Sequence, residues 1–252
     1  MHTFVDLAGV TDLTPDAVLT LLAMLDRAAN AKSLVSGNAP DSPKIRQIFL
    51  HSGFYQYVQS SHVHQVSTDI LSIETGEKVD PVTAGAVVKF ARSKLLLTDR
   101  KLTTGLYTTI METMINVEEH AYSGRKFDKW YLMALHDSSC HRVHFALVDN
   151  GKGIPTTVRK KITDIMGNDA ELLVSTLNGE ERSQTKKAYR GNGLPKVKGY
   201  ADNKKIENLF VISRNGFYDV GRDIRSSLAE PFLGTLISWD FIPEKHDDDQ
   251  CE

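Results

Sequence analysis

Two apolar segments that are separated by only four residues constrain the fold of this 252-residue chain most strongly. KWYLMALHD spans residues 129–137, and RVHFALVD spans residues 142–149. In the second segment Val143, Phe145 and Leu147 alternate with residues of the opposite face, as in a β-strand. A connection this short predicts an antiparallel hairpin.

Helical and extended segments flank this hairpin. Leu106, Ile110, Met114 and Val117 recur at spacings of four, four and three, which predicts a helix over residues 101–122. Further helices are expected at residues 15–32, 44–53, 80–97, 156–166, 169–179 and from 194. Residues 208–221 are expected to form a hairpin that turns at Asn215 and Gly216, and residues 234–243 a final strand. The pattern predicts an α+β fold: a two-layer sandwich of a mixed, mostly antiparallel sheet with helices on one face.

The chain divides near residue 95. Residues 1–95 are expected to form a small N-terminal α/β accessory region, in which Pro15 suits the first position of a helix. Residues 96–243 carry the predicted sheet and helices. Residues 244–252, EKHDDDQCE from 244, are acidic and are expected to be a disordered tail.

Composition limits the class of protein. Hydrophobic residues make up 41% and charged residues 25%, as in ordinary soluble proteins. The net charge of −2 argues against nucleic acid as a partner. Two cysteines cannot form a disulfide framework, and no signal peptide or membrane-spanning stretch is visible. A cytoplasmic protein is therefore expected, with no membrane partner.

Three polar residues lie four apart in the helix predicted around residue 112. Glu112, Asn116 and His120 share one face, because i and i+4 positions do so. An asparagine oxygen suits Mg²⁺, and a carboxylate can deprotonate water or a hydroxyl. Taken alone, the pattern favours a solvated helix face.

A second group follows the strand that ends at Asp149. A carboxylate at a strand end can accept a hydrogen bond from an exocyclic amino group such as that of adenine. Gly151 and Gly153 would let the backbone approach a ligand closely. A simple turn explains the same residues equally well.

Two further groups contain glycines. Gly191 and Gly193 precede a helix that begins near Leu194, which is a phosphate-binding arrangement, although a flexible basic loop is an equal alternative. Gly234 and Thr235 open the last strand, and Thr235 could hydrogen-bond near an adenine.

The order of these four groups resembles the four conserved boxes of the GHKL ATPase superfamily, which includes gyrase, Hsp90, histidine kinases and MutL. The resemblance covers roughly residues 100–243 and implies the ATP-binding fold of that superfamily, known as the Bergerat fold, with ATP and Mg²⁺ as ligands. The matching residues are Glu112, Asn116, His120, Asp149, Gly151, Gly153, Gly191, Gly193, Leu194, Gly234 and Thr235.

The resemblance also implies roles. Asn116 would bind Mg²⁺, Glu112 would be the general base, and Asp149 would accept the adenine amino group. The adenine pocket would be shaped by Gly151, Gly153 and Thr235, and the hinge of a phosphate lid by Gly191, Gly193 and Leu194. The sequence departs from many kinases of the superfamily at Pro195 and Lys196, where Gly-Leu is usual, and this argues against a typical kinase lid.

Three functions remain open. The first is an ATPase whose nucleotide state controls a partner protein; the second is an anti-sigma-type serine/threonine kinase; the third is a nucleotide-sensing module without catalysis. The chain ends too soon for a transducer domain, and His51, His62 and His64 lack a phosphoacceptor context. Residues 3–25 weakly resemble the strand–turn–helix of a STAS domain. A protein partner is expected, either STAS-like or otherwise regulatory, and homodimerisation is common in the superfamily.

Overall fold

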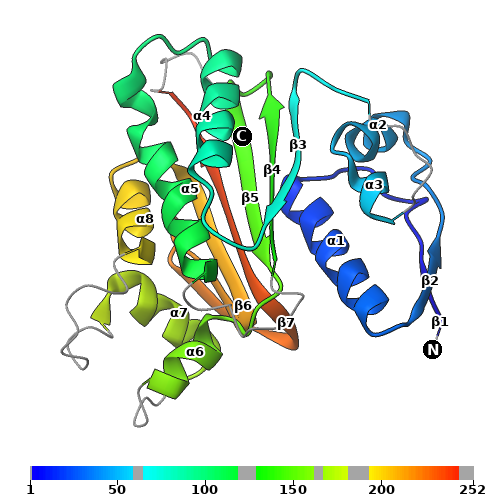
Figure 1. The fold of residues 1–252 in the computed structure, drawn as a ribbon. Coiled ribbons are helices and arrows are strands. Elements are labelled where there is room, and N and C mark those ends of the chain that lie inside the picture. The colour runs from blue at the N-terminus through cyan, green and yellow to red at the C-terminus, as the bar shows by residue number, and fades with distance from the viewer. Residues whose placement is uncertain (1, 59–64, 119–128, 162–166, 181–192, 244–252) are drawn as a thin grey trace.

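A five-stranded antiparallel sheet organises the computed structural model (Figure 1). The structure describes residues 2–58, 65–118, 129–161, 167–180 and 193–243. The strand order is β3-β4-β5-β7-β6. The strands are β3 Ile70–Gly76, β4 Trp130–Asp137, β5 Arg142–Asp149, β6 Glu207–Asp219 and β7 Ile224–Phe241. The predicted hairpin is confirmed, since β4 and β5 pair in continuous register from Trp130 opposite Asp149 to Asp137 opposite Arg142.

Helices of the C-terminal part cover one face of this sheet (Figure 1). These helices are α4 Pro81–Lys94, the 3-10 turn η1 Arg100–Thr103, α5 Thr104–Asn116, α6 Ile154–Lys161, α7 Asp169–Asn178 and α8 Gly193–Asp202. Their apolar side chains pack with Leu132, Phe145 and Trp239 of the sheet in one core.

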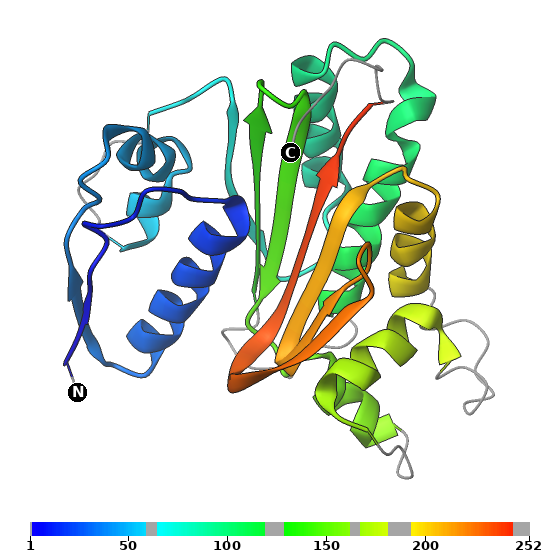
Figure 2. The same ribbon diagram turned by 180° about the vertical axis from the view of Figure 1, so that it is seen from behind.

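The N-terminal region covers the opposite face, as the reverse view shows (Figure 2). It consists of β1 His2–Val5, α1 Pro15–Asn30, β2 Leu34–Gly37, α2 Pro43–His51 and α3 Phe54–Val58. The strands β1 and β2 form a separate parallel pair. The α+β fold and the small N-terminal α/β region that the sequence predicts are therefore confirmed.

Two cores explain why the central strands are apolar at nearly every position. Leu132 and Phe145 face the helical layer, whereas the alternate residues Met133 and Ala146 face the N-terminal region. Side chains of a strand point alternately to opposite faces, so a sheet that is covered on both faces needs continuous apolar runs. None of the described helices combines the length and the apolar character that a membrane span requires.

β3 and α4 lie N-terminal to the expected boundary near residue 95 but join the C-terminal part. β3 pairs with β4, with Gly76 opposite Trp130. α4 contributes Ala84, Val87 and Ala91 to the helical core. The division that packing defines therefore precedes β3.

The hairpin predicted around Asn215 and Gly216 is wrong. β6 runs straight through both residues, and the turn to β7 lies later, between Asp219 and Ile224. The register shifts on either side of Arg214 absorb the irregularity as a bulge. Gly216 is needed for a close contact, because a Cβ there would lie 2.6 Å from the carbonyl carbon of Asp169 in α7.

Gly216→Ala is expected to lower the free energy of unfolding by about 2 kcal/mol, because the added methyl group would force α7 away from the sheet. Gly85→Ala in α4 is the matched control, since no heavy atom lies within 4 Å of its Cβ position. This control is expected to raise stability by up to about 1 kcal/mol. Urea denaturation measures both, and equal effects would contradict the packing explanation.

Candidate functional site

Glu112 and Asn116 lie on the α5 face that borders α8, and both are largely buried, with 9% and 8% exposed. The carboxylate Oε1 of Glu112 is 2.6 Å from the Nζ of Lys196, which lies in the first turn of α8. The backbone of Gly193 comes so close that a Cβ there would lie 2.9 Å from Oε2 of Glu112. Glu112 therefore does not lie on a solvated helix face, which is what its sequence pattern favours when taken alone.

The opposite side of α5 explains how this arrangement is held. Leu106, Ile110 and Met114 are fully buried in the helical core. Their burial fixes the rotation of the helix about its axis, and Leu194 packs into the same core from α8. Glu112 and Lys196 therefore meet at the interface of α5 and α8, where the carboxylate is largely buried and the lysine side chain is half exposed.

Asp149 ends β5 as a buried carboxylate, with 2% exposed. Its Oδ1 accepts a hydrogen bond from the backbone N–H of Gly151 at 2.7 Å. It also accepts bonds from the side chain and backbone of Thr235 on β7. Loss of hydration raises its pKa to about 6, against 3.8 ordinarily, although these bonds and the nearby Arg27 oppose the shift.

The backbone packs closely around Asp149 at two glycines. Gly234 has φ +108°, and a Cβ there would overlap the carbonyl oxygen of Asp149. Gly153 has φ +83°, and a Cβ there would lie 2.8 Å from Oγ of Ser213 and 3.0 Å from the Gly234 carbonyl oxygen. Only glycine fits such a conformation and such a separation without strain.

Ser213 on β6 joins these turns. Its hydroxyl donates to the carbonyl of Gly234 at 2.8 Å and accepts from the N–H of Ile154 at 2.9 Å. It also lies 3.1 Å from the hydroxyl of Thr235. Sequence reasoning missed Ser213, because a serine in an apolar strand carries no signal of which turns it will bridge.

Helix α1 supports the same turns from the other face of the sheet. The Nε of Arg27 donates to Oδ1 of Asn150 at 3.1 Å, and its Nη2 donates to the carbonyl of Leu233. Asp26 accepts a hydrogen bond from Nδ2 of Asn150 at 3.1 Å. Arg27 thereby places a positive charge beneath Asp149, which its pKa reflects.

The structure brings the predicted residues together in two clusters. Glu112, with Asn116 one turn later on the same helix, meets Gly193 at the α5–α8 seam. Asp149 contacts Gly151 and Thr235 at the end of β5. In the second cluster Gly153 packs beside Gly234. In Figure 1 the C-terminal end of α5 and the turn after β5 both lie toward α6 and α7.

Some predicted residues do not join these clusters. Gly191 and His120 lie outside the described residues. Leu194, expected in the lid hinge, is buried in the helical core at the start of α8. Within the described residues no group of three or more His, Cys, Asp and Glu side chains could hold a metal ion. Asn116 and Glu112 together offer two hard oxygen donors, which is few for a cation held by protein alone.

The chain matches no model of a known protein family and no curated protein sequence.

Asp149→Asn is expected to change stability in a pH-dependent manner. The pKa of Asp149 is about 6 in the folded state and 3.8 in the unfolded state, so the folded state binds this proton more tightly. The wild type therefore loses stability as the pH rises from 3.8 to about 6. The variant removes this penalty, which amounts to roughly 3 kcal/mol at most. It should gain on the wild type near neutral pH and lose that gain toward about pH 4. Urea denaturation of both proteins across this range measures the difference, and a constant difference would contradict the assignment.

Proposed function

We propose that this protein binds Mg-ATP as a member of the GHKL superfamily and hydrolyses it slowly, with its nucleotide state controlling a partner protein. The buried carboxylate of Asp149 is the observation that carries the proposal. It lies at a strand end, braced by Thr235 and two glycine turns. A desolvated carboxylate held rigidly is suited to accept a hydrogen bond from the amino group of adenine.

The α5–α8 seam supplies the second half of the proposed site. Asn116 would contribute its amide oxygen to Mg²⁺, which keeps most of its remaining contacts for water and phosphate oxygens. Gly193 leaves no side chain between Glu112 and the start of α8. Backbone N–H groups at a helix start favour phosphate, and α8 begins at Gly193.

Glu112 would act as the general base. In hydrolysis it would take a proton from the water that attacks the γ-phosphate, while the leaving oxygen departs with ADP. Lys196 holds Oε1 of Glu112 in an ion pair, so Oε2 is the oxygen left for the water. Lys196 is half exposed and could equally turn its charge toward a phosphate.

The same ion pair also favours a second candidate function, the nucleotide-sensing module. The oxygen of Glu112 that holds the ammonium group of Lys196 at 2.6 Å is occupied and cannot at the same time take a proton from water. If the pair persisted with nucleotide bound, the protein would bind ATP and signal without turnover. Transfer to a serine or threonine of a partner, as in anti-sigma-type kinases, would use Glu112 on a hydroxyl instead of water.

Incubation with γ-labelled ATP separates these functions. Free labelled phosphate indicates an ATPase, labelled partner protein indicates a kinase, and neither, together with a Mg-ATP-dependent rise in melting temperature, indicates a sensing module. The absence of any thermal shift with Mg-ATP would overturn the proposed function altogether.

Glu112→Gln is expected to retain ATP binding and to lower turnover by about a hundredfold, which is typical for loss of a general base. Glu118→Gln is the matched control. It lies beyond the same helix end, is exposed, and contacts only the backbone N–H of Val79 among the described hydrogen bonds. Phosphate release and thermal shift measure turnover and binding separately. Equal turnover of Glu112→Gln and wild type would remove the base role.

ATP affinity is expected to fall as pH is lowered through about 6, the pKa of Asp149. Protonation converts one acceptor oxygen into a donor, which cannot receive the adenine amino group. Asp149→Asn should bind ATP more weakly near neutral pH, and its affinity should not show this loss near pH 6. Because the nucleotide titrates equally in both experiments, the difference between the two proteins reports Asp149 alone. Calorimetric titration measures both, and identical pH profiles would contradict the adenine role.

The remaining expectations are part of the same proposal. A STAS-like or other regulatory protein is the proposed partner, and self-association into a homodimer is testable by light scattering. A cytoplasmic location is likewise proposed from the sequence.

A further inference from the structure

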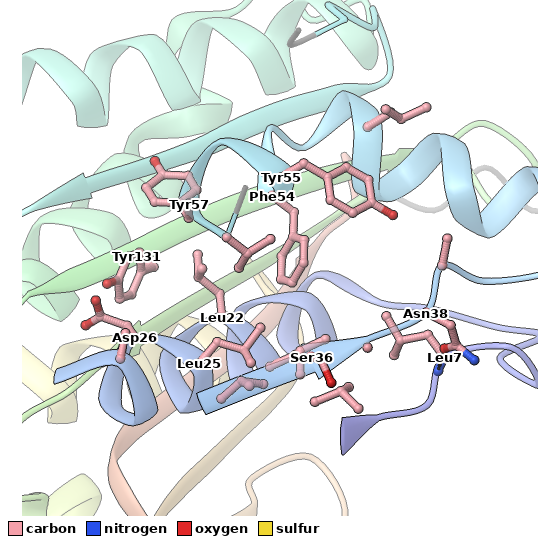
Figure 3. A pocket seen from close by; sticks show the side chains of 18 of the residues that line it. Leu7, Leu22, Leu25, Asp26, Ser36, Asn38, Phe54, Tyr55, Tyr57 and Tyr131 are labelled. Carbon is pink, nitrogen blue, oxygen red and sulfur yellow. Dashed lines mark hydrogen bonds between the residues drawn. The ribbon is translucent and has the colours of Figure 1, made fainter. Parts of the chain in front are cut away.

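A cavity of about 720 Å³ lies inside the N-terminal region, on the face of the sheet opposite α5 and α8 (Figure 3). Helix α1, strand β2 and helix α3 form its walls, and Tyr131 of β4 closes one end. Residues that define its interior are Leu22, Leu25, Val35, Phe54, Tyr57 and Tyr131. Its volume falls within the range of about 300–1,000 Å³ that is usual for small-molecule sites.

The side chains that enclose this cavity are mainly aliphatic and aromatic. Phe54 is buried, whereas Tyr57 and Val58 are 41% and 37% exposed where α3 borders the cavity. Tyr57 and Tyr131 pack edge to face, with ring centroids 6.2 Å apart. These aromatic rings offer flat apolar surfaces to a ligand.

Several polar side chains around the cavity already have partners in the protein. The carboxylate of Asp26 binds the amide of Asn150 and the hydroxyl of Tyr131. Tyr57 donates to the carbonyl of Ile73 at 3.1 Å.

Polar side chains at the opposite end of the cavity are also hydrogen-bonded within the protein. Asn38 accepts from the backbone of Leu7 and donates to Asp6. Arg46 donates twice to the carbonyl of Pro40. A charged ligand would have to compete with these bonds, whereas an apolar ligand would leave them in place.

We propose that this cavity is a binding site for a neutral, mainly apolar small molecule that contains an aromatic ring. Such a molecule would bury apolar surface against Leu22 and Leu25 of α1 and stack near Tyr57 and Tyr131. The site is separate from the proposed nucleotide site and does not depend on it.

The test uses N-phenyl-1-naphthylamine, a neutral aromatic probe whose fluorescence rises in apolar surroundings, with the full chain and no nucleotide. Saturable binding of about one probe per chain is expected. Leu25→Trp fills the cavity and should weaken binding by at least about tenfold, a loss that affinity titration resolves easily.

Met24→Trp is the matched control. Met24 is the preceding residue on α1, is 62% exposed and does not line the cavity. It should bind the probe as the wild type does. Ala29→Phe narrows the cavity from an exposed position of the same helix, and serves if Leu25→Trp fails to fold by circular dichroism.

Three results would overturn the proposal. These are absence of saturable binding to the wild type, unchanged binding by the folded cavity variants, and an equal loss in Met24→Trp. The last result would mean that the probe adheres to the surface of α1. Because nucleotide is absent throughout, failure here leaves the proposed ATP site untouched, and failure of the ATP site leaves this test valid.

Discussion

Burial of β5 on both faces is the constraint on which the rest of the structure depends. Its residues alternate between the helical core and the N-terminal core, and β4 and β7 pair along its edges. The last five residues of β5 are buried, so a charged side chain at this end of the strand must find partners in the protein. Asp149 is that side chain, and its hydrogen bonds with Gly151 and Thr235, together with the nearby charge of Arg27, satisfy it.

The close approach of Gly234 to Asp149 links two turns that are distant in the sequence. β7 comes to lie beside the end of β5 partway along its length, and its first residue paired with β5, Thr235, lies opposite Asp149. Ser213 then connects β6 to the same point. Three strands thus converge on one carboxylate, which gives the candidate site a rigid base.

Periodicity predicted the elements that have long, regular apolar patterns. The β4–β5 hairpin and the helix containing Ile110 and Met114 are of this kind, because their alternation has only one good burial solution. The Asn-Gly pair at 215–216 led to a wrong prediction of a hairpin turn. The same dipeptide that favours a two-residue turn also suits a bulge packed against α7. Local chemistry does not say which of these the tertiary contacts will select.

The site was predictable where one short segment carries it and was not where distant segments meet. Glu112 and Asn116 could be placed on a common helix face from their spacing alone. The partner of Glu112 could not, since Lys196 reaches it from a helix 84 residues later in the chain. Arg27 is similar: its contact with Asn150 spans 123 residues, and an ordinary basic residue on an amphipathic helix gives no sign of it.

Helix α1 both lines the cavity and supports the turns beside Asp149. The N-terminal region is therefore coupled to the sheet through this helix. Leu22 and Leu25 line the cavity, whereas Arg27 reaches the turns at Asn150 and Leu233. Asp26 takes part in both, since it lines the cavity and binds Asn150. A shift of α1 along its axis would therefore disturb the hydrogen bonds beneath Asp149 at the same time as it altered the cavity. The N-terminal region is thus a structural part of the candidate site, because the turn after β5 has one of its supports in α1.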